Sequence, residues 1–298
     1  MSTSKGTTLT DNLTQLTTYD QGELDDPVSL IEPLSADSLA ALDRLARYKP
    51  PPDPYPFPAG RSAVLVALFG SRTGRNLNVL LSTRSPSLRT YARTVALPGG
   101  KMDDTDMNLE ATARREAFEE IGLPIDTTRI RYLTALPPFL ARSMMLITPI
   151  VCFVLDYSLR PELNPSEVST LFSFPLEGFL TSFPDHPIFR DSRLPSSVLA
   201  GETPYHRMED YPWYDGRPQR FHAFEARPQA VEGLTAQMLI HVAQIAYGRP
   251  PDFPLYAPNE LRQDELIQRA MQDPKWHDFR RNWVQKRREE GEEEKAKL

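Results

Sequence analysis

The 298-residue chain lacks several features that define large classes of protein. It has one cysteine, Cys152, which excludes an intramolecular disulfide and a four-cysteine metal site and fits a reducing compartment. Its best apolar stretch, residues 144–155, is interrupted by Thr148 and Pro149 and is too short to span a bilayer. No basic segment followed by an apolar run marks a secretory signal. These absences predict a soluble protein without a membrane span.

Excess positive charge and several common enzyme motifs are also missing. The formal net charge of −6 argues against a broad basic surface, so nucleic acid is not an expected partner. The five histidines show no zinc spacing, and His241 lies in an apolar helical pattern that favours a packed or hydrogen-bonded side chain. The chain has no G-x-S-x-G elbow, Walker loop or dinucleotide-binding G-x-G-x-x-G motif. The enzyme classes that use these motifs therefore lose support.

Composition divides the chain into four segments. Residues 1–28 are rich in Ser, Thr, Gly and Asp and predict a mobile arm. Residues 29–59 predict a short helix and a proline-rich linker. Residues 60–250 carry the strong apolar patterns and predict the main domain. Residues 251–298 form a charged tail, for which one or two solvated helices are the simplest interpretation.

Within the main domain, the apolar pattern predicts strands, then one amphipathic helix, then more strands and a later helix. This order favours an α/β sandwich over a repeated βαβ array. Residues 180–220 have no clear periodicity and are interpreted as a long insertion. The expected strands are 62–69, 77–84, 129–136 and 145–155, and the expected helices are 108–121, with Gly122 as its stop, and 234–248.

Residues 114–122, RREAFEEIG, concentrate like charge on one side of the first expected helix. Glu116, Glu119 and Glu120 fall within an arc of about 100° on a helical wheel. A hard divalent cation would explain this repulsive clustering, because Mg²⁺ and Mn²⁺ prefer oxygen ligands. A solvated acidic face is the alternative, but it does not require this set of residue types. The neighbouring apolar arc, expected to pack, contains Ala113, Ala117, Phe118 and Ile121.

Together with LPGGKMDDTD at 97–106, this stretch resembles the signature of the Nudix hydrolases, which cleave nucleoside diphosphates linked to another group. The resemblance implies a Nudix-type α/β/α sandwich of mixed sheet, to which the chain adds N- and C-terminal helical extensions. It also implies that Arg115 orients the glutamates by ion pairing. The implied ligands of Mg²⁺ or Mn²⁺ are Glu116, Glu119, Glu120 and the carbonyl of Gly100.

The loop before the helix departs from the common Nudix pattern of a glycine, five residues, a glutamate, seven residues and Arg-Glu. Counting back from Arg115 gives Met107 in place of the glutamate and Lys101 in place of the glycine. Counting forward from Gly100 gives Asp106, which we expect to take the structural place of the glutamate. Asp106 is also a suitable helix N-cap. The Nudix subgroup that hydrolyses coenzyme A has the same spacing of acidic residues after its two glycines.

Residues 80–100 resemble the signature of that subgroup. Arg84 and Arg89 can form bidentate contacts with phosphate, which coenzyme A offers in its 3′-phosphate and its diphosphate. Surface arginines at the end of a strand are the alternative. The chain departs from the subgroup at three positions, which usually hold His, Gly and Glu or Gln and here hold Tyr91, Arg93 and Thr94.

Two later segments extend the resemblance over about residues 60–250. Residues 163–180 resemble an Asn-Pro-any-Glu loop followed by a strand and a helix start. Glu167 in this loop is a candidate further metal ligand or general base, and a turn residue that caps the next element is the alternative. Residues 232–239 resemble a WGLTA segment with Glu232 in place of the tryptophan, and we interpret them as core packing.

The resemblance implies metal-dependent hydrolysis of coenzyme A or acyl-CoA to 3′,5′-ADP and (acyl-)4′-phosphopantetheine. The final residues, AKL, fit a C-terminal peroxisomal address and predict a peroxisomal import receptor as a partner. One alternative is a Nudix hydrolase for ADP-ribose, NADH or capped RNA. Another is a catalytically silent nucleotide-binding module, which would be marked by loss of a glutamate, although all three are present.

Overall fold

The computed structural model describes residues 34–273 except 56–59, 72–75, 190–193 and 214. The predicted arm at 1–28 and the C-terminal AKL therefore lie outside the described residues. Among the described residues, no helix has both the length and the apolar character needed to cross a membrane.

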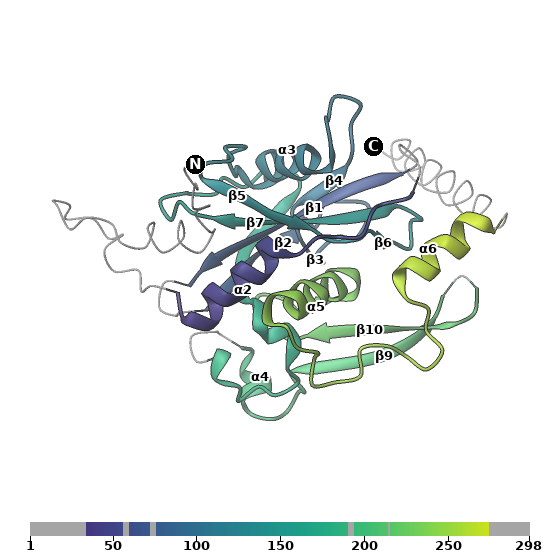
Figure 1. The fold of residues 1–298 in the computed structure, drawn as a ribbon. Coiled ribbons are helices and arrows are strands. Elements are labelled where there is room, and N and C mark those ends of the chain that lie inside the picture. The colour runs from purple at the N-terminus through teal and green to yellow at the C-terminus, as the bar shows by residue number, and fades with distance from the viewer. Residues whose placement is uncertain (1–33, 56–59, 72–75, 190–193, 214, 274–298) are drawn as a thin grey trace, which may run out of the picture.

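The centre of the fold is an eight-stranded mixed sheet (Figure 1). Its main path runs β3-β2-β1-β7-β5, while β4 pairs with β1, β6 with β7 and β8 with β2. Strands β1 and β7 are parallel, and the other pairs are antiparallel. The strands are β1 Arg61–Gly70, β2 Leu77–Arg84, β3 Val95–Ala96, β4 Gly99–Lys101, β5 Ile130–Ala135, β6 Phe139–Leu140, β7 Leu146–Val154 and β8 Val168–Pro175.

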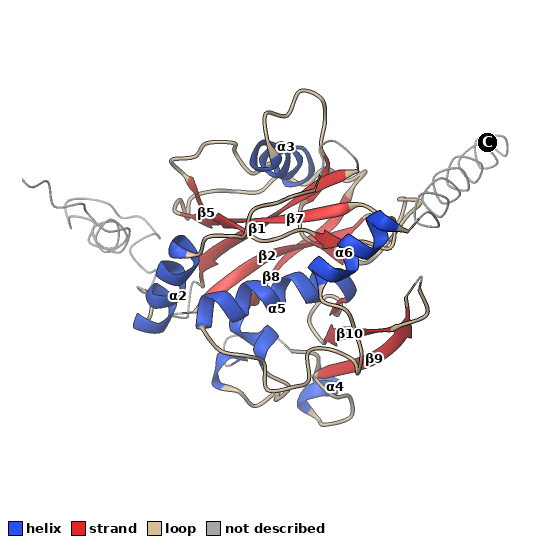
Figure 2. Ribbon diagram, turned by 45° about the vertical axis from the view of Figure 1, so that its right-hand side comes forward, coloured by secondary structure: helices blue, strands red, loops and turns tan. Residues whose placement is uncertain are grey.

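Helices cover both faces of this sheet, which confirms the predicted α/β/α sandwich (Figure 2). Helix α3 (Leu109–Ile121) lies on one face, and α2 (Ala36–Arg47) and α5 (Gly233–Tyr247) lie on the other. Both α2 and α5 agree with the helices expected from the sequence. Their mutual position is fixed in part by Arg44 of α2, whose Nη1 donates to the carbonyl oxygen of Ala246 at 3.0 Å.

Alternate residues of β1 pack into opposite layers, because successive side chains of a strand point to opposite faces. A strand that is buried on both faces reads as a nearly continuous apolar run, which is how SAVLVALF appears in the sequence. The residues that pack with α3 are Ala63, Leu65 and Ala67, and those that pack with α2 and α5 are Val64, Val66 and Leu68.

Residues 180–220 are not the irregular insertion that we expected. They contain β9 and the first residues of β10, and these two strands join β11 in a three-stranded sheet below α5 (Figure 1). The periodicity was missing because nearly all side chains of β9 are exposed, so apolar and polar residues do not alternate. The elements after β8 are the 3₁₀ helices Leu176–Leu180 and Pro187–Phe189, α4 Ser196–Leu199, β9 His206–Pro212, β10 Pro218–Phe224 and β11 Val231–Glu232.

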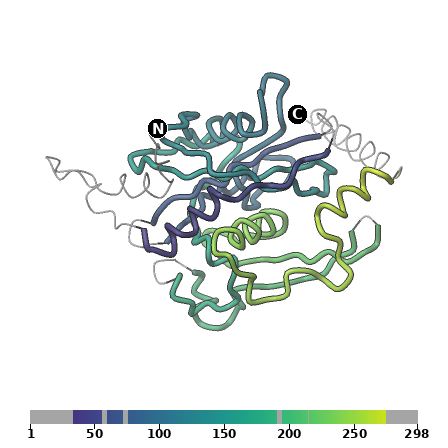
Figure 3. Tube along the Cα trace, in the orientation of Figure 1, coloured from purple at the N-terminus to yellow at the C-terminus, as the bar shows by residue number. Residues whose placement is uncertain are grey.

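The charged tail contains a helix, α6 (Gln263–Gln272), as predicted. The expectation of a solvated helix is wrong for one face of α6, because Leu266, Ile267 and Ala270 are buried in a small cluster that includes Trp213. The Gln263 side chain also accepts a hydrogen bond from the amide of Leu140 at 3.0 Å. Figure 3 shows the yellow C-terminal trace beside the end of the green β9–β10 hairpin.

Candidate active site

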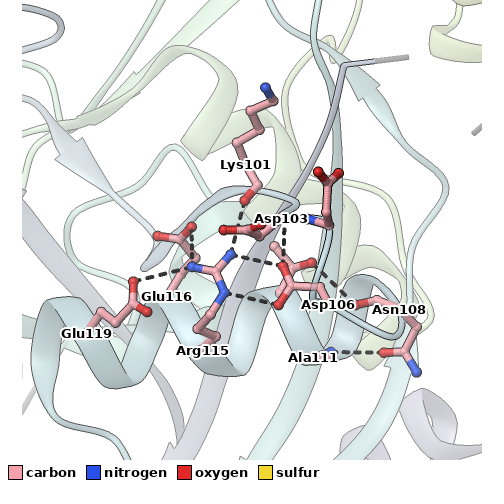
Figure 4. Close-up of polar contacts among 10 residues, drawn as sticks. Lys101, Asp103, Asp106, Asn108, Ala111, Arg115, Glu116 and Glu119 are labelled. Carbon is pink, nitrogen blue, oxygen red and sulfur yellow. Dashed lines mark hydrogen bonds and ion pairs between the residues drawn. The ribbon is translucent and has the colours of Figure 1, made fainter. Parts of the chain in front are cut away.

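The helix that carries the glutamates, α3, begins and ends through local signals. Asn108 is its N-cap, and its Oδ1 accepts a hydrogen bond from the amide of Ala111 at 2.9 Å (Figure 4). Gly122 ends it in the left-handed conformation, with φ 67°, as expected for a glycine stop. The suggestion that Asp106 is the N-cap is wrong, because its carboxylate is bound to Arg115.

Arg115 is at the centre of the polar cluster on α3 (Figure 4). Its Nε and Nη2 donate to the two oxygens of Asp106 at 3.0 and 2.9 Å, and Nη2 also donates to the carbonyl of Lys101 at 3.1 Å. Its Nη1 donates to Glu116 at 3.0 Å and to Glu119 at 3.2 Å. These contacts use all five N–H groups of the guanidinium. The expected ion pairing of Arg115 is therefore present for Glu116 and Glu119, whereas Glu120 is bound by the Gly99 amide instead.

Asp106 binds Arg115 from the loop before α3, while its equivalence to the usual glutamate stays a prediction. Its side chain is 5% exposed and accepts two hydrogen bonds from the Arg115 fork. The bonds to Arg115 lower the pKa of Asp106 to about 2. Because this pKa lies below the ordinary 3.8, the pair stabilises the fold above about pH 4 and loses this effect as pH falls through 2.

Asp106→Asn is therefore expected to lower the free energy of unfolding by about 1 to 2 kcal/mol at pH 7. The difference from wild type should shrink as pH falls from about 4 through 2, because the Asp106 carboxylate becomes protonated over this range. Denaturant unfolding from pH 2 to 7 measures this, with Asp104→Asn on the same loop as the control. A pH-independent difference would contradict an ionic origin.

Glu120 is the most enclosed of the three glutamates, at 6% exposure. Its Oε2 accepts a hydrogen bond from the amide of Gly99 at 3.2 Å. Burial raises the pKa of Glu120 to about 7, the charges of Glu116 and Glu167 act in the same direction, and the Gly99 amide and Arg84 oppose the rise. Two carboxylates close together in a low-dielectric site resist joint ionisation unless a cation is present.

Glu116 and Glu119 are progressively more exposed. Burial also raises the pKa of Glu116, against the opposing effect of its bond to Arg115. The Glu119 side chain is 52% exposed and faces the solvent side of the cluster. Phe118, expected to extend the packed apolar face, is instead 54% exposed, because the small Ala113 and Ala117 already fill the contact with the sheet.

The backbone of Gly100 lies directly against the Glu116 carboxylate. A Cβ on Gly100 would lie 2.5 Å from Cδ of Glu116, closer than side-chain atoms approach one another. A Cβ on Gly99 would lie 2.4 Å from the carbonyl oxygen of Ala63. The two glycines therefore let β4 pair with β1 while it passes beside α3.

Arg84 and Glu167 approach the glutamates from other elements. Arg84 ends β2, and its charge favours ionisation of Glu120. Its Nε is buried and has no hydrogen-bond partner among the described residues. Glu167 lies just before β8, and its charge acts on both Glu116 and Glu120. Arg89 is exposed on the loop after β2, and its contact with phosphate stays a prediction.

The three positions that depart from the coenzyme A subgroup lie on this same loop. Tyr91 and Arg93 have φ angles of 53° and 64°, in the left-handed region that favours glycine. Arg93 stands where the subgroup usually has a glycine, so the loop has a backbone conformation that suits that glycine. Backbone pairing between Arg84 and Thr94, at 2.9 Å, closes the loop.

The donor atoms of the site are oxygens, which suit a hard cation. Among the described residues, however, no group of three or more His, Cys, Asp or Glu side chains is arranged so that it could hold a metal ion as it stands. Glu116 and Glu119 each give one oxygen to Arg115, which leaves the other oxygen of each unused by that bond. Buried carboxylates with raised pKa values, beside a close backbone, supply the oxygen donors that Mg²⁺ or Mn²⁺ requires.

Sequence reasoning missed several residues that shape this site. One is Lys101, whose carbonyl accepts a hydrogen bond from Arg115. Another is Asn108, which caps α3 and could have been predicted, because asparagine is a preferred N-cap residue. Asn164 also contacts α3, through its backbone amide. No local pattern could have shown the contacts of Lys101 and Asn164, because they join segments that are distant in sequence.

Comparison with known proteins identifies relatives of this chain. A family model described as NUDIX domain matches residues 59–192. Nudix hydrolase 15, mitochondrial, from Arabidopsis thaliana is 35% identical over 206 residues, which cover 67% of this chain and 64% of the relative. Peroxisomal coenzyme A diphosphatase 1 from Saccharomyces cerevisiae is 36% identical over 166 residues, which cover 45% of this chain and 48% of the relative. An uncharacterized Nudix hydrolase, NudL, from Klebsiella pneumoniae is 33% identical over 147 residues, which cover 49% of this chain and 73% of the relative.

These matches differ in how much of each protein they cover. The chain spans slightly less than two thirds of the Arabidopsis relative and about half of the yeast relative. The matched family region lies within the predicted main domain, apart from its first residue, and ends before the β9–β10 hairpin. The boundary at residue 250 stays a prediction.

Proposed function

The chain belongs to the Nudix family, and on this premise we propose that it hydrolyses the diphosphate bond of coenzyme A or an acyl-CoA. The products would be 3′,5′-ADP and (acyl-)4′-phosphopantetheine. The observation that carries the proposal is the buried Glu120 beside the half-buried Glu116, which Arg115 holds and the Gly100 backbone borders. Similarity to the yeast peroxisomal coenzyme A diphosphatase supports the choice of substrate.

The proposed cation site is formed by Glu116, Glu119, Glu120 and the carbonyl of Gly100. A bound Mg²⁺ or Mn²⁺ would supply positive charge that offsets the charge of the diphosphate and of the transition state. Arg115 would hold Glu116 and Glu119 in place, and its full set of contacts leaves it no donor for the substrate.

Glu167 is the proposed general base. Its carboxylate would take a proton from the water whose oxygen attacks phosphorus. A new phosphorus–oxygen bond forms, the bond from phosphorus to the bridging oxygen breaks, and that oxygen leaves with the other phosphate. The charge of Glu167 acts on both Glu116 and Glu120, which supports a position beside the reacting group.

Arg84 and Arg89 are the proposed contacts for substrate phosphate. The Nε of Arg84 is buried and unpartnered among the described residues, and the Arg84 charge acts on Glu120, so an incoming anion beside Glu120 would satisfy it. Arg89, exposed on the following loop, would reach a phosphate that lies farther out, such as the 3′-phosphate.

We also propose that the protein acts in peroxisomes, with a peroxisomal import receptor as a partner. The name of the yeast relative supports this location, whereas that of the Arabidopsis relative is mitochondrial. Microscopy of the untagged protein, detected by an antibody, with and without the final AKL, distinguishes the two compartments. Peroxisomal signal that disappears without AKL is the expected result, and mitochondrial signal would overturn it.

A substrate panel tests the proposed activity. The panel contains coenzyme A, acetyl- and long-chain acyl-CoA, ADP-ribose, NADH and capped RNA, each with Mg²⁺ or Mn²⁺ and with products separated by mass. We expect 3′,5′-ADP from the coenzyme A compounds, and loss of turnover when EDTA removes the metal. Preference for another substrate would overturn the coenzyme A assignment and point to Tyr91, Arg93 and Thr94. No turnover of any substrate would favour a silent nucleotide-binding module.

A further inference from the structure

The loop that carries Glu167 is attached directly to the carboxyl end of α3. The amide of Asn164 donates to the carbonyl of Glu120 at 2.9 Å, and the amide of Glu162 donates to the carbonyl of Ile121 at 3.0 Å. The loop passes so close to Gly122 that a Cβ there would lie 2.9 Å from the amide nitrogen of Glu162. The loop is thus fixed to the same residue that supplies the most buried carboxylate.

Asn164 then folds the chain into the turn that ends at Glu167. Its carbonyl accepts hydrogen bonds from the amides of Glu167 at 3.0 Å and Val168 at 2.9 Å. Its side-chain Oδ1 accepts from the amide of Ser166 at 3.2 Å and from the Ser166 hydroxyl at 2.6 Å. Asparagine first and proline second, as in Asn164-Pro165, are the residues that favour a tight turn of this kind.

A second attachment holds the other side of the same turn. The carbonyl of Glu167 accepts a hydrogen bond from the amide of Ser85 at 2.8 Å, and Ser85 directly follows Arg84. The Ser169 hydroxyl donates to the carbonyl of Thr83 at 3.1 Å. The backbone of Glu167 is therefore tied both to the helix of the proposed cation ligands and to the strand of a proposed phosphate contact.

We propose that Asn164 is a positioning residue that holds the Glu167 carboxylate beside Glu116 and Glu120. This inference rests on the proposed function, because it assumes that Glu167 serves the reaction. Three carboxylates of like charge repel one another, and an exposed loop can relieve that repulsion by moving Glu167 toward solvent. The two bonds accepted by the Asn164 side chain oppose this movement, since they fix the turn before Glu167.

The decisive variant is Asn164→Ala, compared with Asn164→Asp and with the control Asp126→Ala. Asp126 lies on the loop between α3 and β5 and makes the same arrangement, accepting from the amide and the hydroxyl of Thr128, each at 2.7 Å. Asn164→Ala should lower kcat by about 10- to 100-fold with KM changed less than about twofold, because misplacing a catalytic group by about 1 Å has effects of this size. Asp126→Ala should leave kcat unchanged while lowering Tm about as much.

Rescue and coupling separate positioning from general damage. Asn164→Asp keeps the accepting oxygen and should recover most of kcat. In the double variant with Glu167→Gln, adding Asn164→Ala should cause no further loss, because both changes remove the same contribution. Equal kcat loss in Asn164→Ala and Asp126→Ala, absence of rescue, or additive losses would each overturn the proposal.

Hydrogen exchange provides a readout that does not depend on the substrate. Amides of residues 166–168 should exchange faster in Asn164→Ala and at the wild-type rate in Asp126→Ala, and unchanged exchange in Asn164→Ala would overturn the positioning role by itself. Retained kcat in Glu167→Gln would instead remove the proposed general base, and no turnover in the substrate panel would remove the proposed function, while either result would leave the exchange result intact.

Discussion

Glu120→Gln is expected to lower kcat by about 10³-fold, because a lost metal ligand removes several kcal/mol of transition-state stabilisation. The same substitution should stabilise the metal-free protein at high pH. The pKa of Glu120 is raised by burial to about 7 from the ordinary 4.5. Ionising this buried carboxylate therefore costs stability as pH rises from about 4.5 through 7, and glutamine avoids that cost.

Two measurements on one variant thus move in opposite directions. Unfolding of Glu120→Gln in EDTA should show a gain of about 2 kcal/mol at pH 8 that is absent at pH 4. Steady-state kinetics with Mn²⁺ should show the loss of kcat. Glu162→Gln, an exposed glutamate on the neighbouring loop, is the control and should change neither quantity. Wild-type turnover by Glu120→Gln would refute the assignment of Glu120 as a metal ligand.

Gly100→Ala is expected to have the second largest effect, although it adds only a methyl group. The new Cβ would lie 2.5 Å from Cδ of Glu116, so either the carboxylate or β4 must move. Because backbone pairing with β1 holds β4 in place, the Glu116 carboxylate moves more easily than the strand and should be displaced. We expect a loss of about 10²-fold in kcat, the effect of misplacing a group by about 1 Å.

Binding of Mn²⁺, followed by calorimetry or electron paramagnetic resonance, should weaken in Gly100→Ala together with kcat. Gly201→Ala is a strict control, because its φ of 74° adds backbone strain while no atom lies within 4 Å of the new Cβ. It should lower Tm without changing kcat or Mn²⁺ affinity. Unchanged Mn²⁺ affinity in folded Gly100→Ala would argue against a ligand set that includes Glu116 and Gly100.

The elements that were predicted well are those whose burial leaves a local pattern. The strand at 77–84 agrees with β2 at both ends, and the helix at 234–248 agrees with α5 to within a residue. The helix expected at 108–121 agrees with α3 to within a residue, and Gly122 marks its C-terminal end as predicted. In contrast, β9 has exposed side chains and is a strand only because β10 pairs with it, which no local pattern reports.

The site was predictable to the same extent and for the same reason. Helical spacing alone places Arg115 and the three glutamates on adjacent turns. It does not reveal that Glu119 is exposed while Glu120 is enclosed, because that difference depends on β4 lying over one side of the helix. The attachment of the Asn164 turn to Glu120 joins residues 44 positions apart and is equally invisible in the sequence.

The pairing of β4 with β1 determines where Gly100 lies relative to Glu116. Gly100 lies opposite Ala63, in a strand whose alternate side chains are locked into two different layers. A slip of one residue would bring Lys101 opposite Ala63 and would place a long side chain where the glycine now leaves room for Glu116. The packing of β1 in the hydrophobic core thus fixes the position of Gly100 beside Glu116. A substitution that disturbs this packing far from the site would therefore also disturb the arrangement of the carboxylates.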